Sequence, residues 1–77
     1  MEEFLRYAIG AMVENPASIV VSKTESTGRL DFHVAIQKSD APRVIGRNGH
    51  TIRALRTLLS AAGRKRNLST SLELIES

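Results

Sequence analysis

The chain has 77 residues, of which 11 are Lys or Arg and 8 are Asp or Glu, and it contains no cysteine. This length allows one small domain over residues 1–77, and such a chain buries only about 60% of its unfolded surface. The lack of cysteine excludes disulfides and thiolate metal sites and fits a reducing compartment. The start of the sequence is acidic, and no apolar run approaches membrane-spanning length. We therefore expect no signal peptide, no transmembrane helix and a cytoplasmic location.

The net charge of +3 is divided unevenly between the two halves of the chain. Residues 1–40 carry four Lys or Arg against six Asp or Glu, a charge of −2, whereas residues 41–77 carry seven against two, a charge of +5. The seven basic residues of the second half fall between Arg43 and Arg66, where the sequence has no acidic residue. Such a segment is the electrostatic footprint expected of a protein that binds a polyanion.

The first forty residues predict a helix followed by two strands. Apolar residues recur at helical spacing over residues 2–14, and Asn15-Pro16 should end this helix because a residue before proline is pushed out of the α region. Residues 18–23 contain a β-branched run, and residues 30–37 alternate apolar with mostly polar side chains, as strands do. Residues 25–28 supply turn chemistry between the two strands, so we expect a hairpin.

The second half predicts two helices and a final strand. Asp40 resembles an N-cap, and a short helix should follow it and end at Gly46. A second amphipathic helix is expected over residues 50–62 and should close at Gly63. Its inward stripe comprises Ile52, Leu55, Leu59 and Ala62. After a basic loop, residues 68–75 alternate as a strand does, with two leucines, Leu72 and Leu74, pointing inward.

The strand, two helices and strand from residue 30 to residue 75 would form a crossover unit. Its outer strands should lie parallel in one sheet, because a connection of this length with helices joins parallel strands. Both helices would then cover the same face of that sheet. The predicted fold class is therefore α+β, with the order α-β-β-α-α-β and a three-stranded sheet covered on one face by helices.

The turn Gly46-Arg47-Asn48-Gly49 separates the two later helices. Glycine has no Cβ, so the chain can turn there at positive φ and a sugar-phosphate strand can approach closely. The helix that follows directs free N–H groups and a positive dipole end at the same place. Asn48-Gly49 is also a strong hairpin signal, but the helical spacing of residues 50–62 favours a turn that opens a helix, with Asn48 as a candidate N-cap. This segment is expected to bind an anion.

The stretch Ile45-Gly46-Arg47-Asn48-Gly49 resembles the Ile-Gly-x-x-Gly loop of the KH-domain RNA-binding proteins, and the element order is similar to their type II, or prokaryotic, arrangement. Residues 51–57, Thr-Ile-Arg-Ala-Leu-Arg-Thr, are similar to the helix start Thr-Ile-x-Ala-Ile-Arg-Thr of the small stand-alone bacterial KhpA family. The resemblance covers the whole chain. One departure is Ala41-Pro42-Arg43, where many relatives carry a glycine and a lysine, although Arg43 can supply the lysine's charge.

The resemblance implies that the domain clamps about four nucleotides of single-stranded RNA by their backbone beside the glycine loop. The loop N–H groups and Arg47 would hold phosphates, Arg43 and Arg53 would flank the strand, and Val44, Ile45 and Ile36 would form an apolar floor for the bases. The residues expected to bind RNA are Gly46, Arg47, Asn48, Gly49, Arg43, Val44, Ile45, Arg53 and His50. A role as a bacterial post-transcriptional regulator or RNA chaperone follows from the same resemblance.

Enzymatic functions are disfavoured. A Walker-type nucleotide site needs a lysine that Gly49-His50-Thr51 lacks. His33 and His50 have no cysteine or paired carboxylates nearby, so we expect no catalytic residue, no metal site and no cofactor. The aromatic residues are only Phe4, Tyr7 and Phe32, so backbone clamping should dominate over base stacking.

The alternative function is a protein-interaction adaptor that uses the fold mainly for assembly. The resemblance implies a homodimer, or a heterodimer with a larger KH-containing protein of the KhpB, or Jag, type. The lack of a membrane-spanning apolar run predicts no membrane partner. Leu58 falls off the inward stripe of its helix, so we expect it to be exposed and to be buried by a second chain. It could instead pack under the N-terminal helix of its own chain. Arg56 could serve either RNA or a partner protein.

Overall fold

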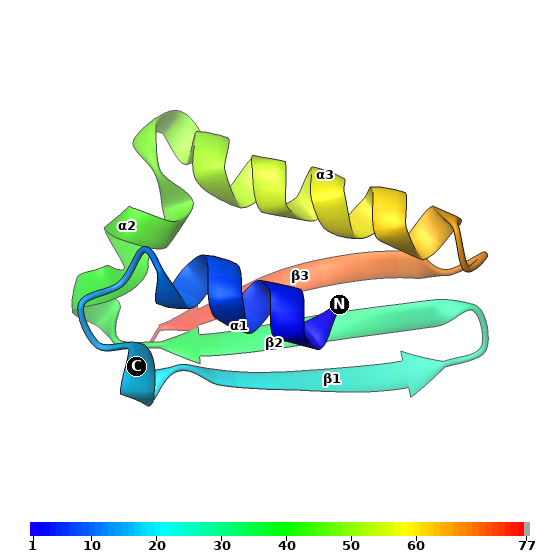
Figure 1. Cartoon of the computed structure of the whole chain (residues 1–77), viewed down its shortest axis with the longest axis horizontal. Helices are drawn as coiled ribbons and strands as arrows, with labels where there is room; N and C mark the ends of the chain where they lie inside the picture. Colours follow the sequence, from blue (N-terminus) through cyan, green and yellow to red (C-terminus); the bar gives the residue numbers. More distant parts are fainter. Residues whose placement is uncertain (77) are drawn as a thin grey trace.

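A computed structural model describes residues 1–76, and Figure 1 shows them as helices packed on a single sheet. The element order confirms the predicted α+β arrangement, with two strands after the first helix and a helix pair before the last strand. The bounds are α1 Glu2–Gly10, β1 Val20–Ser26, β2 Arg29–Ile36, α2 Ala41–Ile45, α3 His50–Arg64 and β3 Ser69–Glu76.

The sheet has the strand order β1-β2-β3, so β2 is central. β1 pairs with β2 in the antiparallel sense, which confirms the predicted hairpin. β3 pairs with β2 in the parallel sense after the crossover through α2 and α3, as predicted. Phe32 at the middle of β2 lies opposite Lys23 on one side and Leu72 on the other. The last strand of the sequence therefore lies beside the hairpin's second strand along the full length of β2.

The core lies between the helices and one face of the sheet. Burial alternates along β2, as expected for a strand with one covered face. The buried side chains of β2, which are Leu30, Phe32, Val34 and Ile36, form one cluster with Leu5 and Ile9 of α1, Val44 of α2, and Ile52, Leu55 and Leu59 of α3. α1 packs against β1, and α3 packs against β3. No helix within residues 1–76 has the length and apolar content needed to cross a bilayer.

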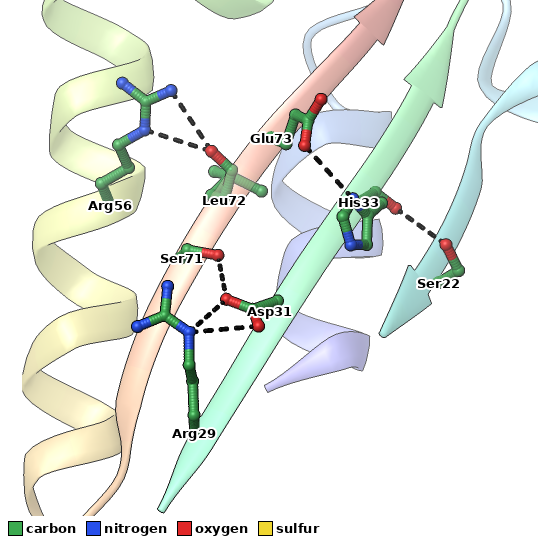
Figure 2. A network of polar contacts seen from close by, with 8 residues as sticks. All are labelled: Ser22, Arg29, Asp31, His33, Arg56, Ser71, Leu72 and Glu73. Carbon is green, nitrogen blue, oxygen red and sulfur yellow. Dashed lines mark hydrogen bonds and ion pairs between the residues drawn. The ribbon is translucent and has the colours of Figure 1, made fainter. Parts of the chain in front are cut away.

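The opposite face of the sheet carries a network of polar residues, as Figure 2 shows, and beyond it the exposed apolar residues Val20 and Ile75. Asp31 accepts hydrogen bonds from Ser71 Oγ at 2.5 Å and from Arg29 Nε at 2.9 Å. These donors, the Ser71 hydroxyl foremost, hold the pKa of Asp31 below its ordinary value. His33 Nδ1 lies 3.5 Å from a carboxylate oxygen of Glu73. Polar groups that pair across the strands in this way suit a sheet face that carries no helix.

Helix α1 ends at Gly10, so the predicted extension of this helix to Glu14 is wrong. Glycine costs about 1 kcal/mol relative to alanine inside a helix, so Gly10 weakens its continuation. The N–H groups of Glu14 and Asn15 donate instead to the carboxylate of Asp40, at 3.1 and 3.3 Å. A contact that is distant in sequence therefore replaces the last helical turn.

Asp40 stands at the predicted N-cap position of α2, but its carboxylate faces the loop after α1. The residue is only 2% exposed, and it also accepts a hydrogen bond from Asn15 Nδ2 at 3.2 Å. The donors from Glu14, which contributes most, and from Asn15 lower the pKa of Asp40 below its ordinary 3.8. The carboxylate thus joins the end of the first helix to the start of the segment that carries the glycine turn.

Two further boundaries differ from the prediction. α3 does not close at Gly63 but runs to Arg64, and a Cβ at Gly63 would lie 2.7 Å from Thr70 Cγ2. This glycine therefore allows α3 to pack closely on the start of β3, and the left-handed residue of the turn is Asn67, with φ +58°. β1 runs on to Ser26, so the hairpin turn is shorter than predicted.

We predict that Asp40→Asn lowers the thermal midpoint at pH 7 and flattens its fall on acidification. Because the folded pKa of Asp40 is depressed, its stabilising contribution is present above the ordinary pKa of 3.8 and is lost as the pH falls through the lower folded value. Thermal unfolding followed by circular dichroism between pH 7 and pH 2 measures both effects. Glu3→Gln on the exposed side of α1 is the control, and an equal loss in both variants would contradict the prediction.

Candidate nucleic-acid interface

Gly46 ends α2 with φ +76° and ψ 174°, a conformation that is essentially restricted to glycine. The Thr51 side chain also packs directly against the Gly46 backbone. A Cβ at this position would be 2.3 Å from Thr51 Oγ1 and 2.8 Å from Thr51 Cβ. Both the backbone conformation and this contact exclude a side chain. The close approach of Thr51 to Gly46 fixes the angle at which the chain leaves α2 and enters α3, and sequence reasoning had assigned Thr51 no role.

The next turn contains two left-handed residues in succession. Asn48 has φ +55° and ψ 25°, and Gly49, the N-cap residue of α3, has φ +73° and ψ 16°. The prediction that Asn48 caps α3 is therefore wrong, since Asn48 lies one residue too early and belongs to the turn. Asparagine is among the few residues that adopt this conformation at low cost. The pair Asn48-Gly49 gives the loop a shape that most residue pairs could not hold.

The N–H groups of the loop divide into two sets. Gly46 N–H donates to the Pro42 carbonyl at 3.0 Å, and Gly49 N–H donates to the Gly46 carbonyl at 3.2 Å. The N–H groups of Arg47 and Asn48 have no acceptor among residues 1–76. These two donors lie at the exposed tip of the loop, where an anion can reach them. Of the loop N–H groups that were predicted to bind phosphate, only those of the two central residues are therefore available.

The arginines around the loop have different partners. Arg47 is exposed at the loop tip, and no ion pair engages it within residues 1–76. Arg43 on α2 is paired with Glu14, with 2.5 Å between Nη2 and Oε1. Both side chains of this pair are exposed, so the pair adds little to stability and a phosphate can compete for Arg43.

Arg53 is tied to the loop itself. Its Nη2 donates to the Asn48 carbonyl, and its Nε donates to the Gly49 carbonyl at 3.3 Å. The guanidinium therefore supplies hydrogen-bond donors to the carbonyls of both left-handed residues of the turn. The prediction that Arg53 flanks a bound strand remains a prediction, and the structure adds that Arg53 supports the loop from within.

The predicted apolar floor is only partly available. Val44 is 0% exposed and Ile36 is 2% exposed, so these two side chains belong to the core and cannot contact a ligand in this structure, which corrects that part of the prediction. Both lie on the inward face of their elements, where the central cluster covers them. Ile45 is half-buried and His50 is exposed at the start of α3, so both remain candidates.

A groove of about 320 Å³ between α3 and the outer edge of β3 was not predicted. It is lined by Arg56, Leu59 and Ser60 of α3 and by Thr70, Ser71 and Leu72 of β3. Arg56 reaches across to the edge strand, where Nε and Nη2 donate to the Leu72 carbonyl at 3.3 and 3.2 Å, as Figure 2 shows. The groove joins residues more than ten positions apart, and no local pattern in the sequence signals it.

A second hollow, of about 380 Å³, lies between α1 and α3 and is mainly apolar. Met1 and Phe4 of the N-terminal segment and Leu58 and Ala62 of α3 contribute to it. Leu58 is 55% exposed and Phe4 is 40% exposed. The alternative that Leu58 packs under α1 of its own chain is therefore wrong, and the exposure predicted for Leu58 is confirmed.

The comparisons with known proteins agree with this geometry. A sequence model described as KhpA/KhpB, KH domain, matches residues 2–74. The chain belongs to the KhpA/KhpB KH-domain family. It is 34% identical to the "RNA-binding protein KhpA" of Chlamydia pneumoniae over 99% of this chain and 97% of that protein, and 34% identical to the protein of the same name from Listeria monocytogenes serovar 1/2a over 99% and 100%. A Treponema pallidum relative is 35% identical over 97% of this chain and 94% of its own.

Family membership confirms the predicted resemblance and the type II KH order of elements. The prediction that the chain is not an enzyme agrees with the family, whose curated relatives bear the name of RNA-binding proteins.

We predict that alanine is tolerated less well at Gly46 than at Gly49. Gly46→Ala adds a clash with Thr51 to a strained conformation and should cost roughly 2–4 kcal/mol of unfolding free energy, since strain of this kind alone costs about 1–3 kcal/mol. Gly49→Ala places a Cβ 3.8 Å from Arg53 Nε and should cost about 1–2 kcal/mol. Urea denaturation measures both costs.

Gly49→Asn is the matched control, because asparagine adopts the conformation of Gly49 but not that of Gly46. Asparagine should therefore restore most of the stability at position 49 and none at position 46. If alanine and asparagine each lowered the unfolding free energy equally at positions 46 and 49, the backbone conformations assigned to Gly46 and Gly49 would be contradicted.

Proposed function

We propose that the protein binds single-stranded RNA and clamps about four nucleotides by their backbone beside the loop Gly46-Arg47-Asn48-Gly49. The observation that carries this proposal is the pair of N–H groups of Arg47 and Asn48, which have no acceptor among residues 1–76 and stand at an exposed basic turn. Two adjacent amide donors and one guanidinium suit a phosphate group. The glycines on either side leave room for the sugar to approach.

Charge supports the choice of a polyanion. From Arg43 to Arg66 the chain carries seven basic residues and no acidic one. Glu14 pairs with Arg43 from outside this segment, and because both side chains are exposed an RNA phosphate can displace the carboxylate. A bound strand would then follow the loop and continue into the groove between α3 and β3, where Arg56 supplies a further cation.

The relatives support RNA as the ligand, since the Chlamydia and Listeria proteins are both named RNA-binding protein KhpA. We infer that this chain acts on RNA in the bacterial cytoplasm as a post-transcriptional regulator or RNA chaperone. A domain that holds the backbone with few aromatic residues should bind many sequences with modest preference, which fits such a role.

An exposed apolar surface favours a second proposal, that the protein assembles with itself or with a larger KH protein of the KhpB type. Phe4 and Leu58 flank the hollow between α1 and α3, and large apolar side chains that are exposed together mark an interaction surface. A two-fold dimer through α3 would bury Leu58 in both chains and place two glycine loops on one particle. Assembly and RNA binding are compatible, since avidity for RNA with two sites would rise.

We predict that the double variant Arg47→Asp, Asn48→Asp keeps the fold and loses RNA affinity by more than about tenfold, because like charges would face the phosphates across the loop. Fluorescence anisotropy with a labelled single strand of about eight nucleotides measures affinity, and circular dichroism checks the fold. Lys65→Asp, Asn67→Asp is the matched control. This control changes the charge by the same amount and also replaces a left-handed residue, Asn67. Its two positions lie at the other end of α3 from the glycine loop.

Salt dependence supplies an independent check on the same proposal. Three or four phosphate contacts on a single strand should give a slope of log affinity against log salt of about −2 to −3. Single-stranded RNA should also compete better than a duplex of the same sequence, because paired bases cannot enter the groove. A flat salt profile, a preference for duplex, or equal binding by the two double variants would contradict the loop clamp.

We predict that the protein self-associates at micromolar concentration and that Leu58→Glu prevents this, because the variant places a charge where an apolar contact is needed. Sedimentation velocity should then show particles heavier than the 8.5 kDa monomer only for the wild type. Ser60→Glu, which lies about 200° around α3 from Leu58, is the control and should behave as the wild type does. A wild-type protein that stays monomeric would contradict self-association, and only a different partner protein could then cover this surface.

A further inference from the structure

The guanidinium of Arg56 is held in one orientation at the edge of β3. Its Nε and Nη2 both donate to the Leu72 carbonyl, so one long side of the planar group faces the strand, as Figure 2 shows. β3 is an edge strand of the described sheet, and in Figure 2 the Leu72 carbonyl lies on the side of β3 that faces α3, away from β2. The two hydrogen bonds remove much of the rotational freedom that an exposed arginine usually keeps.

The rest of the guanidinium is available to a ligand. The group has five N–H donors, and the bonds to Leu72 use two of them. The other three have no acceptor among residues 1–76, and two of these, one on each terminal nitrogen, lie parallel at the end of the group. In Figure 2 the far nitrogen of Arg56 points away from β3 and toward the first turns of α3, which begin at the glycine loop. A pair of parallel donors is thus positioned beside the path proposed for the RNA.

The surroundings of Arg56 favour a base over a phosphate. The groove of about 320 Å³ in which it lies is lined mainly by apolar surface, although the side chains of Leu59 and Leu72 at its base are themselves buried. Apolar walls can contact the face of a base, whereas a phosphate has no apolar face and loses hydration there. The loop donors of Arg47 and Asn48 already provide for the backbone of the strand. A strand held there would turn its bases toward the groove.

We infer that Arg56 determines base specificity by donating two parallel hydrogen bonds to a base that presents two neighbouring acceptors. This inference rests on the proposed binding of single-stranded RNA. Guanine offers O6 and N7, and cytosine offers N3 and O2, whereas adenine and uracil present an acceptor next to a donor on each accessible edge. A donor group of adenine or uracil that faced Arg56 would find no acceptor, because the guanidinium has only donors. The site therefore selects guanine or cytosine over adenine or uracil.

The experiment measures the affinity of the full chain for four eight-nucleotide RNAs, which are U8 and the same strand with one central guanine, cytosine or adenine. The wild type should bind the guanine strand, the cytosine strand or both about tenfold more tightly than the U8 and adenine strands. Arg56→Lys keeps the charge but cannot form the bidentate pair, so the preference among the four strands should disappear. Arg64→Lys, at the end of α3 and outside the groove, should keep the preference.

The possible results separate this inference from the proposed function. Wild-type protein that binds all four strands equally would overturn the base specificity and leave RNA binding intact. Equal weakening for all four strands in Arg56→Lys would show a phosphate contact and would also overturn it. Failure of the wild type to bind any strand would overturn the proposed function itself. The comparison of strands on the wild type needs no variant, so a loss of stability in Arg56→Lys cannot obscure the result.

Discussion

The close packing of Thr51 against Gly46 is the contact on which the arrangement of the molecule depends. With φ +76° and ψ 174°, Gly46 lets the chain reverse between α2 and α3 within a few residues. α2 can therefore bury Val44 in the core while α3 lies along the same face of the sheet. The same reversal exposes the N–H groups of Arg47 and Asn48. A single backbone conformation thus sets both the layer of helices and the position of the free donors.

Arginines contribute to the structure as well as to the charge of the surface. Arg53 donates to the carbonyls of the left-handed turn, and Arg56 donates to the carbonyl of the edge strand. In each case one side of the guanidinium bonds to the protein, and donors on the other side remain for a ligand. In the proposed contacts with RNA, this arrangement would lower the entropy that each arginine loses, because its position is already fixed. Arg43 differs, since its pair with Glu14 must open before a phosphate can bind.

The two hollows of the molecule lie on different sides of α3 and suit different partners. The groove beside β3 combines Arg56 with hydroxyl-bearing residues, whereas the hollow beside α1 is bordered by Met1, Phe4 and Leu58. Because these residues lie on separate faces of one helix, a protein bound through Leu58 would leave the edge of β3 open. A small domain can therefore combine assembly with RNA binding without using the same surface twice.

The sequence by itself determined the features that depend on local patterns. Alternation along residues 30–37 predicted the half-buried strand β2, helical spacing predicted α3, and the two glycines with Arg47 and Asn48 between them predicted the sharp turn between α2 and α3. Only the tertiary structure decided the rest. Asp40 takes the N–H groups of Glu14 and Asn15, so α1 ends at Gly10, and burial removes Val44 and Ile36 from the predicted floor. The groove at Arg56 exists because α3 and β3 meet in space. Periodicity and turn chemistry act between near neighbours in the chain, whereas burial and these hydrogen bonds depend on which distant segments come together.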